Sequence, residues 1–304
     1  MSERYLYMNG RLVPYGEATI HVQSNAVKYG TSVFEGLRAY WNESRQELFV
    51  FRLGEHCRRL FDSLKLMRME HEFTLEELRH SVLETLRKNE YREDVHVRQT
   101  AYLAADGNVE ATGPTGLAVD ARPRKLAGKA ALDICVSSWV RIPDGAMPPR
   151  IKCSANYQNG RLAFLEAKAG GYDYTVLLNS RGKVSEAPGA ALFMVRGGVP
   201  ATPPVTADVL ESITRTTLVQ LFREQHGLSV AERDIDRTEL CVADEAFLCG
   251  SGWEVTPVAS VDRLPLGQPA PGPLTRAIAA TYFRAVRGEL PEYGDWLTPV
   301  YGRA

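Results

Sequence analysis

Short apolar runs separated by turn residues open the chain. The runs 5–8 and 11–13 flank Asn9-Gly10, a dipeptide typical of a two-residue hairpin turn. Two further runs, 37–41 and 47–51, predict a second pair of strands. Over 55–69 and 74–88, apolar residues recur every three or four positions, which predicts two amphipathic helices. These elements indicate a small α+β domain that covers residues 1–120.

A basic stretch separates this part from the second half. Residues 121–130 contain Pro123 and Gly128 among several arginines and lysines, as expected of a connector, and we find no regular apolar pattern over 116–129. A larger domain then spans 131–304, and its tail after Gly288 is expected to form a surface strap. Within it, apolar runs predict strands over 132–140, 174–178 and 191–195, and helices over 159–168 and 213–225.

Composition and charge narrow the class of protein. Of the 304 residues, 44% are hydrophobic and 24% charged, and 36 basic side chains balance 37 acidic ones. This is the profile of a globular protein without the basic surface that binds nucleic acid or an anionic membrane. No stretch reaches the roughly 18 apolar residues of a membrane helix, and the N-terminus has no signal-peptide core. We therefore expect a cytoplasmic protein with a small-molecule ligand.

Cysteine and histidine spacing gives no sign of a metal site. The five cysteines are scattered, without the paired spacing of zinc ligands or of a disulfide framework. No cluster of histidines and carboxylates has ligand spacing either, so we expect no metal. Cysteine catalysis is also disfavoured, because no histidine is positioned as a base beside a thiol.

Several polar residues stand beside backbone features suited to an anionic ligand. Lys152 precedes a predicted helix, and Glu186 lies among small residues before an apolar strand. Residues 210–215 begin a helix whose first amides can bind an anion, and the Gly-Ser-Gly turn 250–252 can do the same. Taken singly, the first three are more often a surface lysine, a solvated glutamate and a helix start that binds water. The Gly-Ser-Gly turn is about equally often an ordinary tight turn.

Taken together, these stretches resemble the class IV, or fold type IV, pyridoxal-phosphate aminotransferases. Within that family, the chain is most similar to branched-chain amino-acid aminotransferases, over almost its whole length. The resemblance implies a small α+β domain and a larger α/β domain with the cofactor pyridoxal 5′-phosphate between them. It rests on residues 29–40, 51–52, 55–60, Lys152 with Asn156-Tyr157, Ser185-Glu186, 210–214, 243–247 and 254–258.

The resemblance implies three catalytic residues. Lys152 would form the Schiff base and move the α-proton, Glu186 would keep the ring nitrogen protonated, and Tyr157 would bind the ring's 3-oxygen. Lys168 is a competing candidate for the Schiff-base lysine, because the Ala-Gly-Gly that follows it resembles the sequence after the catalytic lysine in some relatives. Its position inside a predicted helix favours Lys152.

The same resemblance implies the remaining contacts. Those expected to hold the cofactor, besides the catalytic three, are Arg59, Leu210, Ile213, Thr214 and Ser251. Those expected to line the substrate pocket are Tyr29, Phe34, Gly36, Arg38, His96, Arg98, Ser251 and Gly252. On residue type alone, His96 is more simply a hydrogen-bonded strand histidine than a proton shuttle. In the family, Tyr29 and the loop 107–109 reach the neighbouring subunit, which implies at least a homodimer.

Four features depart from the family pattern and leave the substrate open. Ala190 and Ala191 replace a glutamate and an asparagine, His96 replaces a tyrosine, Trp253 replaces a small residue, and the connector is short. We expect ping-pong transamination between leucine, isoleucine or valine and a 2-oxo acid such as 2-oxoglutarate. The alternatives on the same fold are D-amino-acid transaminase, (R)-amine transaminase and an aminodeoxychorismate lyase-like enzyme. A non-catalytic binding protein is the rival from another class.

Overall fold

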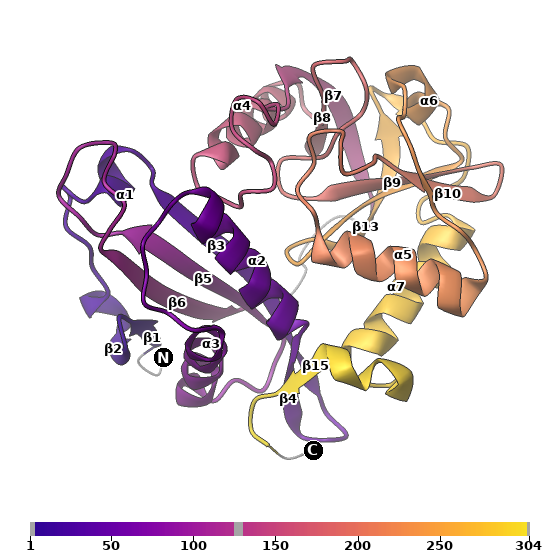
Figure 1. Cartoon of the computed structure of the whole chain (residues 1–304). Coiled ribbons are helices and arrows are strands. Elements are labelled where there is room, and N and C mark those ends of the chain that lie inside the picture. Colours follow the sequence, from indigo (N-terminus) through magenta and orange to yellow (C-terminus); the bar gives the residue numbers. More distant parts are fainter. Residues whose placement is uncertain (1–3, 125–129, 303–304) are drawn as a thin grey trace. The chain divides into compact units, whose positions relative to one another are not determined.

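The computed structural model describes residues 4–124 and 130–302. The described chain forms two compact units (Figure 1). Unit 1 comprises residues 4–124, 151–155 and 285–302, and unit 2 comprises 130–150 and 156–284. The short segment 151–155 and the C-terminal segment thus group with unit 1, although the apolar pattern along the chain places both in the second domain.

An antiparallel sheet of seven strands forms the body of unit 1, in the order β15-β4-β3-β5-β6-β1-β2. Asn9-Gly10 makes the turn of the β1–β2 hairpin, as predicted, and both residues have positive φ. The strands are β1 (Tyr5–Met8), β2 (Arg11–Pro14), β3 (Ser32–Asn42), β4 (Glu47–Phe51), β5 (Val95–Leu103), β6 (Thr115–Pro123) and β15 (Leu297–Pro299).

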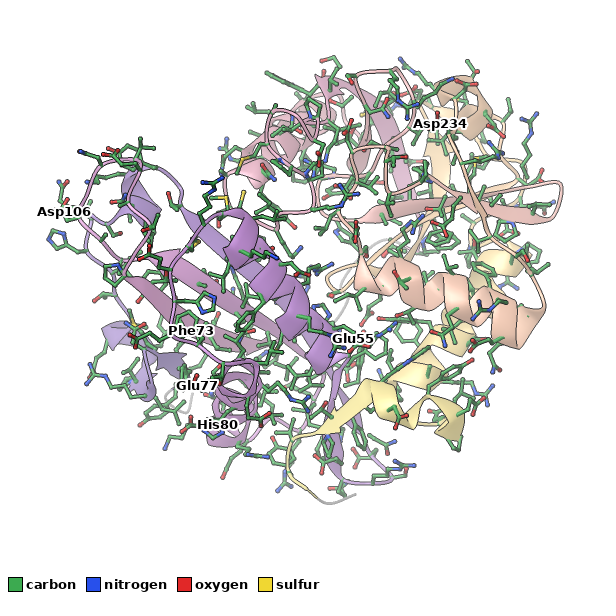
Figure 2. All side chains as sticks on the ribbon, viewed as in Figure 1. Glu55, Phe73, Glu77, His80, Asp106 and Asp234 are labelled. Atoms are coloured by element: carbon green, nitrogen blue, oxygen red, sulfur yellow. The ribbon has the colours of Figure 1, made fainter. Side chains whose placement is uncertain are left out.

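Two helices cover one face of this sheet. Helix α2 (Leu53–Leu66) packs on β3, and α3 (Leu75–Asn89) packs on β1 and β6 (Figure 1). Thr74 caps α3 through a reciprocal capping box with Glu77. Glu77 is labelled in Figure 2. Both predicted helices are confirmed, with ends within three residues of those expected. The remaining helices of this unit are short: η1 (Tyr15–Glu17), α1 (Asn25–Lys28) and η2 (Pro291–Trp296).

Two expectations for unit 1 are wrong. Residues 115–123 form strand β6, in which Leu117, Val119 and Ala121 are buried in alternation, so the pattern does not fail there. The tail after Gly288 forms β15, which pairs with β4, and is not a surface strap. Strand β15 has three residues and its partner β4 lies far away along the chain, so local spacing gives little signal of it. Strand β6 pairs with the preceding strand β5, but small and polar residues among its apolar ones hide the alternation. Residues 125–129 of the expected connector lie outside the described residues.

A mixed sheet forms the body of unit 2, in the order β11-β10-β9-β12-β13-β7-β8, with β14 beside β13. The pairs β10–β11, β13–β7 and β7–β8 are parallel, and the others are antiparallel. The strands are β7 (Leu132–Val140), β8 (Tyr174–Leu178), β9 (Ala191–Arg196), β10 (Val199–Thr202), β11 (Ala231–Glu232), β12 (Glu245–Gly250), β13 (Glu254–Val261) and β14 (Leu264–Pro265).

The helices of unit 2 pack against this sheet. Helix α4 (Asn156–Ala169) lies on β7 and β8, α5 (Ile213–His226) on β12, and α6 (Arg237–Cys241) on β13. The predictions of α4 and α5 are confirmed, with α4 beginning three residues earlier than expected. Helix α7 (Pro273–Val286) was not predicted. None of the helices in the described part of the chain has the length and apolar character needed to cross a membrane.

Candidate active site

One face of the unit 1 sheet gathers most of the expected substrate residues. Side chains alternate across a strand, so Phe34, Gly36 and Arg38 share the face of β3 opposite to α2. Gly36 pairs with Arg98 of β5, and Arg38 pairs with His96. Tyr29 is not on this face: it ends α1, before the strand begins, and its side chain is exposed.

Phe34 forms the centre of this face. The guanidinium carbon of Arg98 lies 3.7 Å from the Phe34 ring centroid, and Lys152 Nζ lies 5.0 Å from it. A Cβ placed on Gly36 would lie 3.4 Å from His96 Nε2, so the imidazole sits over this glycine. One surface therefore carries, in turn, the ammonium of Lys152, the ring of Phe34, the guanidinium of Arg98 and the imidazole of His96.

Backbone contacts fix Lys152 at the start of β3. Phe34 N donates to Lys152 O at 2.9 Å, and Lys152 N donates to Ser63 Oγ of α2 at 3.1 Å. The next residue, Cys153, makes an antiparallel bridge with Val33. The segment 151–155 therefore extends along β3, which explains how a lysine far along the chain belongs to unit 1.

A buried carboxylate holds Arg59 in one orientation. Glu35 is fully buried between β3 and α2, and it accepts bonds from Arg59 Nε at 2.7 Å and from Arg59 Nη2 at 2.8 Å. Burial alone would raise the pKa of Glu35, but Arg59 and His56 together hold the pKa far below its usual range. The carboxylate is therefore ionised, and the guanidinium is fixed by a bidentate pair.

His56 completes this network on the other side of Glu35. Its Nδ1 lies 2.6 Å from Glu35 Oε2, and the imidazole is buried. Burial, together with the positive charges of Arg59 and Lys152, lowers the pKa of His56, although the Glu35 carboxylate raises it. We therefore describe the contact as a hydrogen bond donated by a neutral imidazole rather than as an ion pair.

His96 is also neutral. Burial lowers its pKa to about 3, helped by the positive charges of Arg124, Arg38, Arg122 and Arg98. Within this group, Arg38 Nη1 donates to the carbonyl oxygen of Arg124 at 2.8 Å. The far end of the face is consequently cationic, although the imidazole itself carries no charge.

Glu186 is the centre of the candidate residues in unit 2. The side chain is buried, and Leu210 N donates to its Oε2 at 3.1 Å. Arg141 donates to Oε1 from Nε at 3.0 Å and from Nη2 at 2.8 Å. Tyr157 lies in the first turn of α4. Burial raises the pKa of Tyr174, and the charges of Tyr157 and Glu186 raise it further, which places all three side chains near one another.

The expected phosphate contacts of unit 2 lie on a helix start and a turn. Ile213 and Thr214 are the first two residues of α5, whose amides have no carbonyl partner one turn earlier. Ser212 caps the helix by accepting a bond from Arg215 N. Ser251 and Gly252 lie in the turn between β12 and β13, and a Cβ on the preceding Gly250 would lie 3.4 Å from Gly189 O.

Trp253 packs toward the core of unit 2. Its ring centroid lies 4.3 Å from that of Tyr174, which in turn lies 5.2 Å from Phe164. Its Nε1 is 3.7 Å from the position that a Cβ on Gly189 would take. The tryptophan thus covers the turn in which alanines 190 and 191, both buried, replace larger polar residues of the family.

The expected residues therefore form two sets, one in each unit. Lys152, Arg59 and the substrate face belong to unit 1; Tyr157, Glu186, Leu210, Ile213, Thr214, Ser251 and Gly252 belong to unit 2. Sequence reasoning missed the roles of Glu35 and Arg141. A carboxylate inside the apolar run around Glu35 is a usable signal of a buried ion pair, whereas Arg141 follows a strand end and gives none.

Comparison with known proteins identifies the family. Residues 32–261 match the family model described as amino-transferase class IV. The chain belongs to the class IV aminotransferases. Residues expected to form its cofactor site in both units, including Lys152, Arg59, Glu186 and Thr214, lie within the matched range.

The similarity of this aminotransferase to relatives extends over its whole length. It is 38% identical to a probable branched-chain-amino-acid aminotransferase of Aquifex aeolicus, covering 98% of this chain and 97% of the relative. The crystal structure of a branched-chain amino acid aminotransferase from Thermobaculum terrenum in its PLP form matches with a TM-score of 0.93, at 43% identity and 98% coverage of both chains. The predicted two-domain, fold type IV class is confirmed.

A third relative carries a cofactor adduct. The crystal structure of the T.th. branched-chain amino acid aminotransferase complexed with N-(5′-phosphopyridoxyl)-L-glutamate matches with a TM-score of 0.93, at 37% identity and 99% coverage of both chains. Pyridoxal 5′-phosphate is the cofactor of this family, and the donor set of the present aminotransferase fits it. Unit 2 offers a buried carboxylate and a helix start, and unit 1 offers a fixed guanidinium and a lysine.

Proposed function

We propose that this aminotransferase transfers the amino group of leucine, isoleucine or valine to 2-oxoglutarate in a ping-pong cycle. One observation carries the proposal: Lys152 Nζ and the Arg98 guanidinium lie over the same Phe34 ring. An amine that can move a proton, an apolar surface for an aliphatic side chain and a cation for a carboxylate are thereby combined. The names of the relatives from Aquifex aeolicus and Thermobaculum terrenum support the same substrate class.

The residues of each unit have distinct parts in this proposal. Bound pyridoxal phosphate supplies an aldehyde that links to amines and a ring that withdraws electrons from the reacting carbon. Lys152 would be the base that moves the α-proton between the substrate carbon and the cofactor carbon. Glu186 keeps the ring nitrogen protonated, and Tyr157 donates to the ring's 3-oxygen. Leu210 packs on the ring, and the phosphate is held by Arg59, the amides of Ile213 and Thr214, and Ser251.

The cationic end of the substrate face supports a dicarboxylate as amino acceptor. His96 is neutral, so it can donate or accept a hydrogen bond, while Arg38 and Arg98 provide fixed positive charge. Phe34 and Gly36 leave an apolar path between this end and Lys152. One surface can thus accept an aliphatic donor and an anionic acceptor in turn, as ping-pong transamination requires. In unit 2, we propose that Ser251 and Gly252 contact the substrate.

We also propose a homodimer in which the loop near α1 contacts the second copy. Asn25 Nδ2 donates to Asn108 O, and Lys28 Nζ donates to Asp106 Oδ1 at 3.0 Å, so α1 and the loop around Asp106 form one structure (Figure 2). This structure exposes Val22, Val27, Tyr29 and Val109, whose relative exposures are 65%, 49%, 47% and 68%. Large apolar groups so exposed favour association. Sedimentation of V109E is expected to show monomer where the unaltered chain is dimeric.

The cytoplasmic location expected from the sequence is retained as part of the proposal. Fractionation of cells that express the chain tests it: recovery with membranes or in the exported fraction would contradict it.

The absorbance spectrum of the purified protein tests the proposed chemistry. We expect a yellow protein whose visible band is bleached fastest by L-leucine. Bleaching only by D-alanine would indicate a D-amino-acid transaminase, and bleaching only by (R)-1-phenylethylamine would indicate an (R)-amine transaminase. A protein that stays colourless after addition of pyridoxal phosphate would refute the cofactor and the proposed chemistry.

Substitution of the two candidate lysines separates their roles. We expect Lys152→Ala to abolish turnover and the spectral change with L-leucine, since no other amine is proposed to link the cofactor. The matched control is Lys168→Ala, an exposed position on α4 whose Nζ lies 5.6 Å from the Phe164 ring. Full activity of the Lys152 variant, or loss of activity in the Lys168 variant alone, would show that Lys152 is not the residue that carries the chemistry.

A further inference from the structure

The buried ion pair between Arg141 and Glu186 is not explained by the fold alone. Arg141 follows the last residue of β7, and its backbone N donates to Leu178 O at the end of β8 at 2.8 Å. The exposed fractions of the two side chains are only 11% for Arg141 and 8% for Glu186. Replacing such a pair by packed apolar residues is often neutral or stabilising, so its presence in unit 2 needs a reason other than stability.

The contacts of Glu186 fix the direction of its carboxylate. Two nitrogens of Arg141 donate to Oε1, at 3.0 Å from Nε and 2.8 Å from Nη2, while Leu210 N donates to Oε2 at 3.1 Å. The backbone is held as well, since Leu177 N donates to Glu186 O at 2.9 Å. Rotation of the side chain would break bonds at both oxygens, so the carboxylate keeps one orientation.

The charge of Arg141 also favours the ionised form of Glu186. A carboxyl group in a buried site tends to bind a proton and become neutral, because burial disfavours the charged form. A guanidinium cannot lose its proton in a protein, so its constant positive charge at 2.8 Å favours the ionised carboxylate. The ionised form binds a protonated ring nitrogen much more strongly than the neutral acid does, because the hydrogen bond is then reinforced by the attraction of opposite charges.

We propose that Arg141 is the positioning residue that keeps Glu186 ionised and correctly oriented before the cofactor binds. This inference rests on the proposed function, in which Glu186 pairs with the ring nitrogen of pyridoxal phosphate. Arg141 acts through Glu186 and is given no direct contact with the cofactor. Its effect must therefore disappear when Glu186 can no longer be ionised.

A double-mutant cycle tests this dependence. The variants are Arg141→Met, Glu186→Gln and the combination of both, with Arg181→Met as the matched control. Arg181 also makes a bidentate ion pair in unit 2, with Asp234, but the two side chains are 53% and 37% exposed (Figure 2). Thermal unfolding of each variant shows whether it is folded, and Arg141→Lys restores the charge without the forked geometry.

The first measurement is the affinity of the cofactor-free protein for pyridoxal phosphate as a function of pH. We expect R141M to weaken binding about tenfold near neutral pH and less at higher pH, because the carboxyl must lose a proton before it can form an ion pair with the protonated ring nitrogen. R141K is expected to restore the pH profile of the unaltered protein, and R181M to change nothing. In the E186Q background, R141M is expected to have less than about a twofold effect.

The second measurement needs no cofactor. Infrared difference spectra of cofactor-free R141M are expected to show a protonated carboxyl band near neutral pH that is missing from the unaltered protein and from R141M/E186Q. Lack of this band, or an equal loss of affinity in both backgrounds, would overturn the inference while leaving the proposed function intact. If the unaltered protein binds no pyridoxal phosphate, both the proposed function and the proposed role of Arg141 are refuted.

Discussion

Replacing Glu35 by glutamine removes the negative charge that holds Arg59 and receives the His56 hydrogen bond. Glutamine has the same shape, so the change isolates charge from packing. Its amide oxygen can still accept bonds from His56 Nδ1 and Arg59 Nη2, which both bind Oε2 in the unaltered protein. Its NH₂ group would take the place of Oε1 and face the N–H donor of Arg59 Nε, which now lies 2.7 Å from that oxygen. A guanidinium whose side chain is only 13% exposed would then lack its counter-charge.

The expected cost follows from this burial. Removing one partner of a buried ion pair costs about 3–5 kcal/mol, because the remaining charge stays desolvated. Equilibrium unfolding in urea measures this loss at neutral pH. The matched control is Glu55→Gln at the start of α2 (Figure 2), where Glu55 pairs with Arg52 but remains 33% exposed. That variant is expected to lose less than about 1 kcal/mol.

The pH dependence of stability provides a second test of Glu35→Gln. The pKa of Glu35 is lower in the folded protein than in the unfolded chain, so its stabilising effect is full above the unfolded value of 4.5 and is lost as pH falls below it. E35Q should therefore show a smaller loss of stability between neutral and acidic pH. A loss below about 1 kcal/mol, or one equal to that of E55Q, would refute the view that Glu35 is the anchor of Arg59.

Three further predictions concern other parts of the chain. Folding lowers the pKa of His96 from 6.5 to about 3, so its contribution to the free energy of unfolding is full above pH 6.5 and is lost as pH falls toward 3. Urea unfolding of H96N should therefore depend less on pH between 6.5 and 3 than that of the unaltered protein. Thr74→Ala removes the capping box of α3 and should cost about 1 kcal/mol in the same assay. A Cβ at Gly160 would lie 2.7 Å from Pro188 Cβ, so G160A should cost about 1–3 kcal/mol and weaken cofactor binding by moving the turn after Glu186. A fully stable, cofactor-loaded G160A would contradict that packing.

Sequence reasoning succeeded where the signal is local or forms an ordered motif. The hairpin at Asn9-Gly10 and helix α3 follow from turn chemistry and apolar spacing. The family followed from several short motifs in one order, although none is specific alone. The positions of Lys152 and Glu186 were named because each belongs to such a motif. Their roles stay predictions that the spectra and variants described above will test.

Contacts between segments that lie far apart along the chain were not predicted from the sequence. Strand β15 has three residues, and its pairing with β4 depends on a register that no local pattern encodes. Arg141 reaches Glu186 across 45 positions, and the Glu35–Arg59 pair joins a strand to a helix face. Charged residues are usually at the surface, so composition alone assigns such side chains to solvent, whereas three-dimensional pairing buries them.

The pairing of β15 with β4 has a consequence for synthesis on the ribosome. Val300 N donates to Glu47 Oε1 over a separation of 253 positions, so β4 stays without its edge partner until a segment about 250 residues further along has been made. At about 5–20 residues per second, that interval lasts roughly 10–50 s, during which all of unit 2 is translated. Throughout this time the nascent β4 is an uncovered edge, a template for pairing with other chains. Truncation before Leu297 should therefore appear first as aggregation of newly made protein.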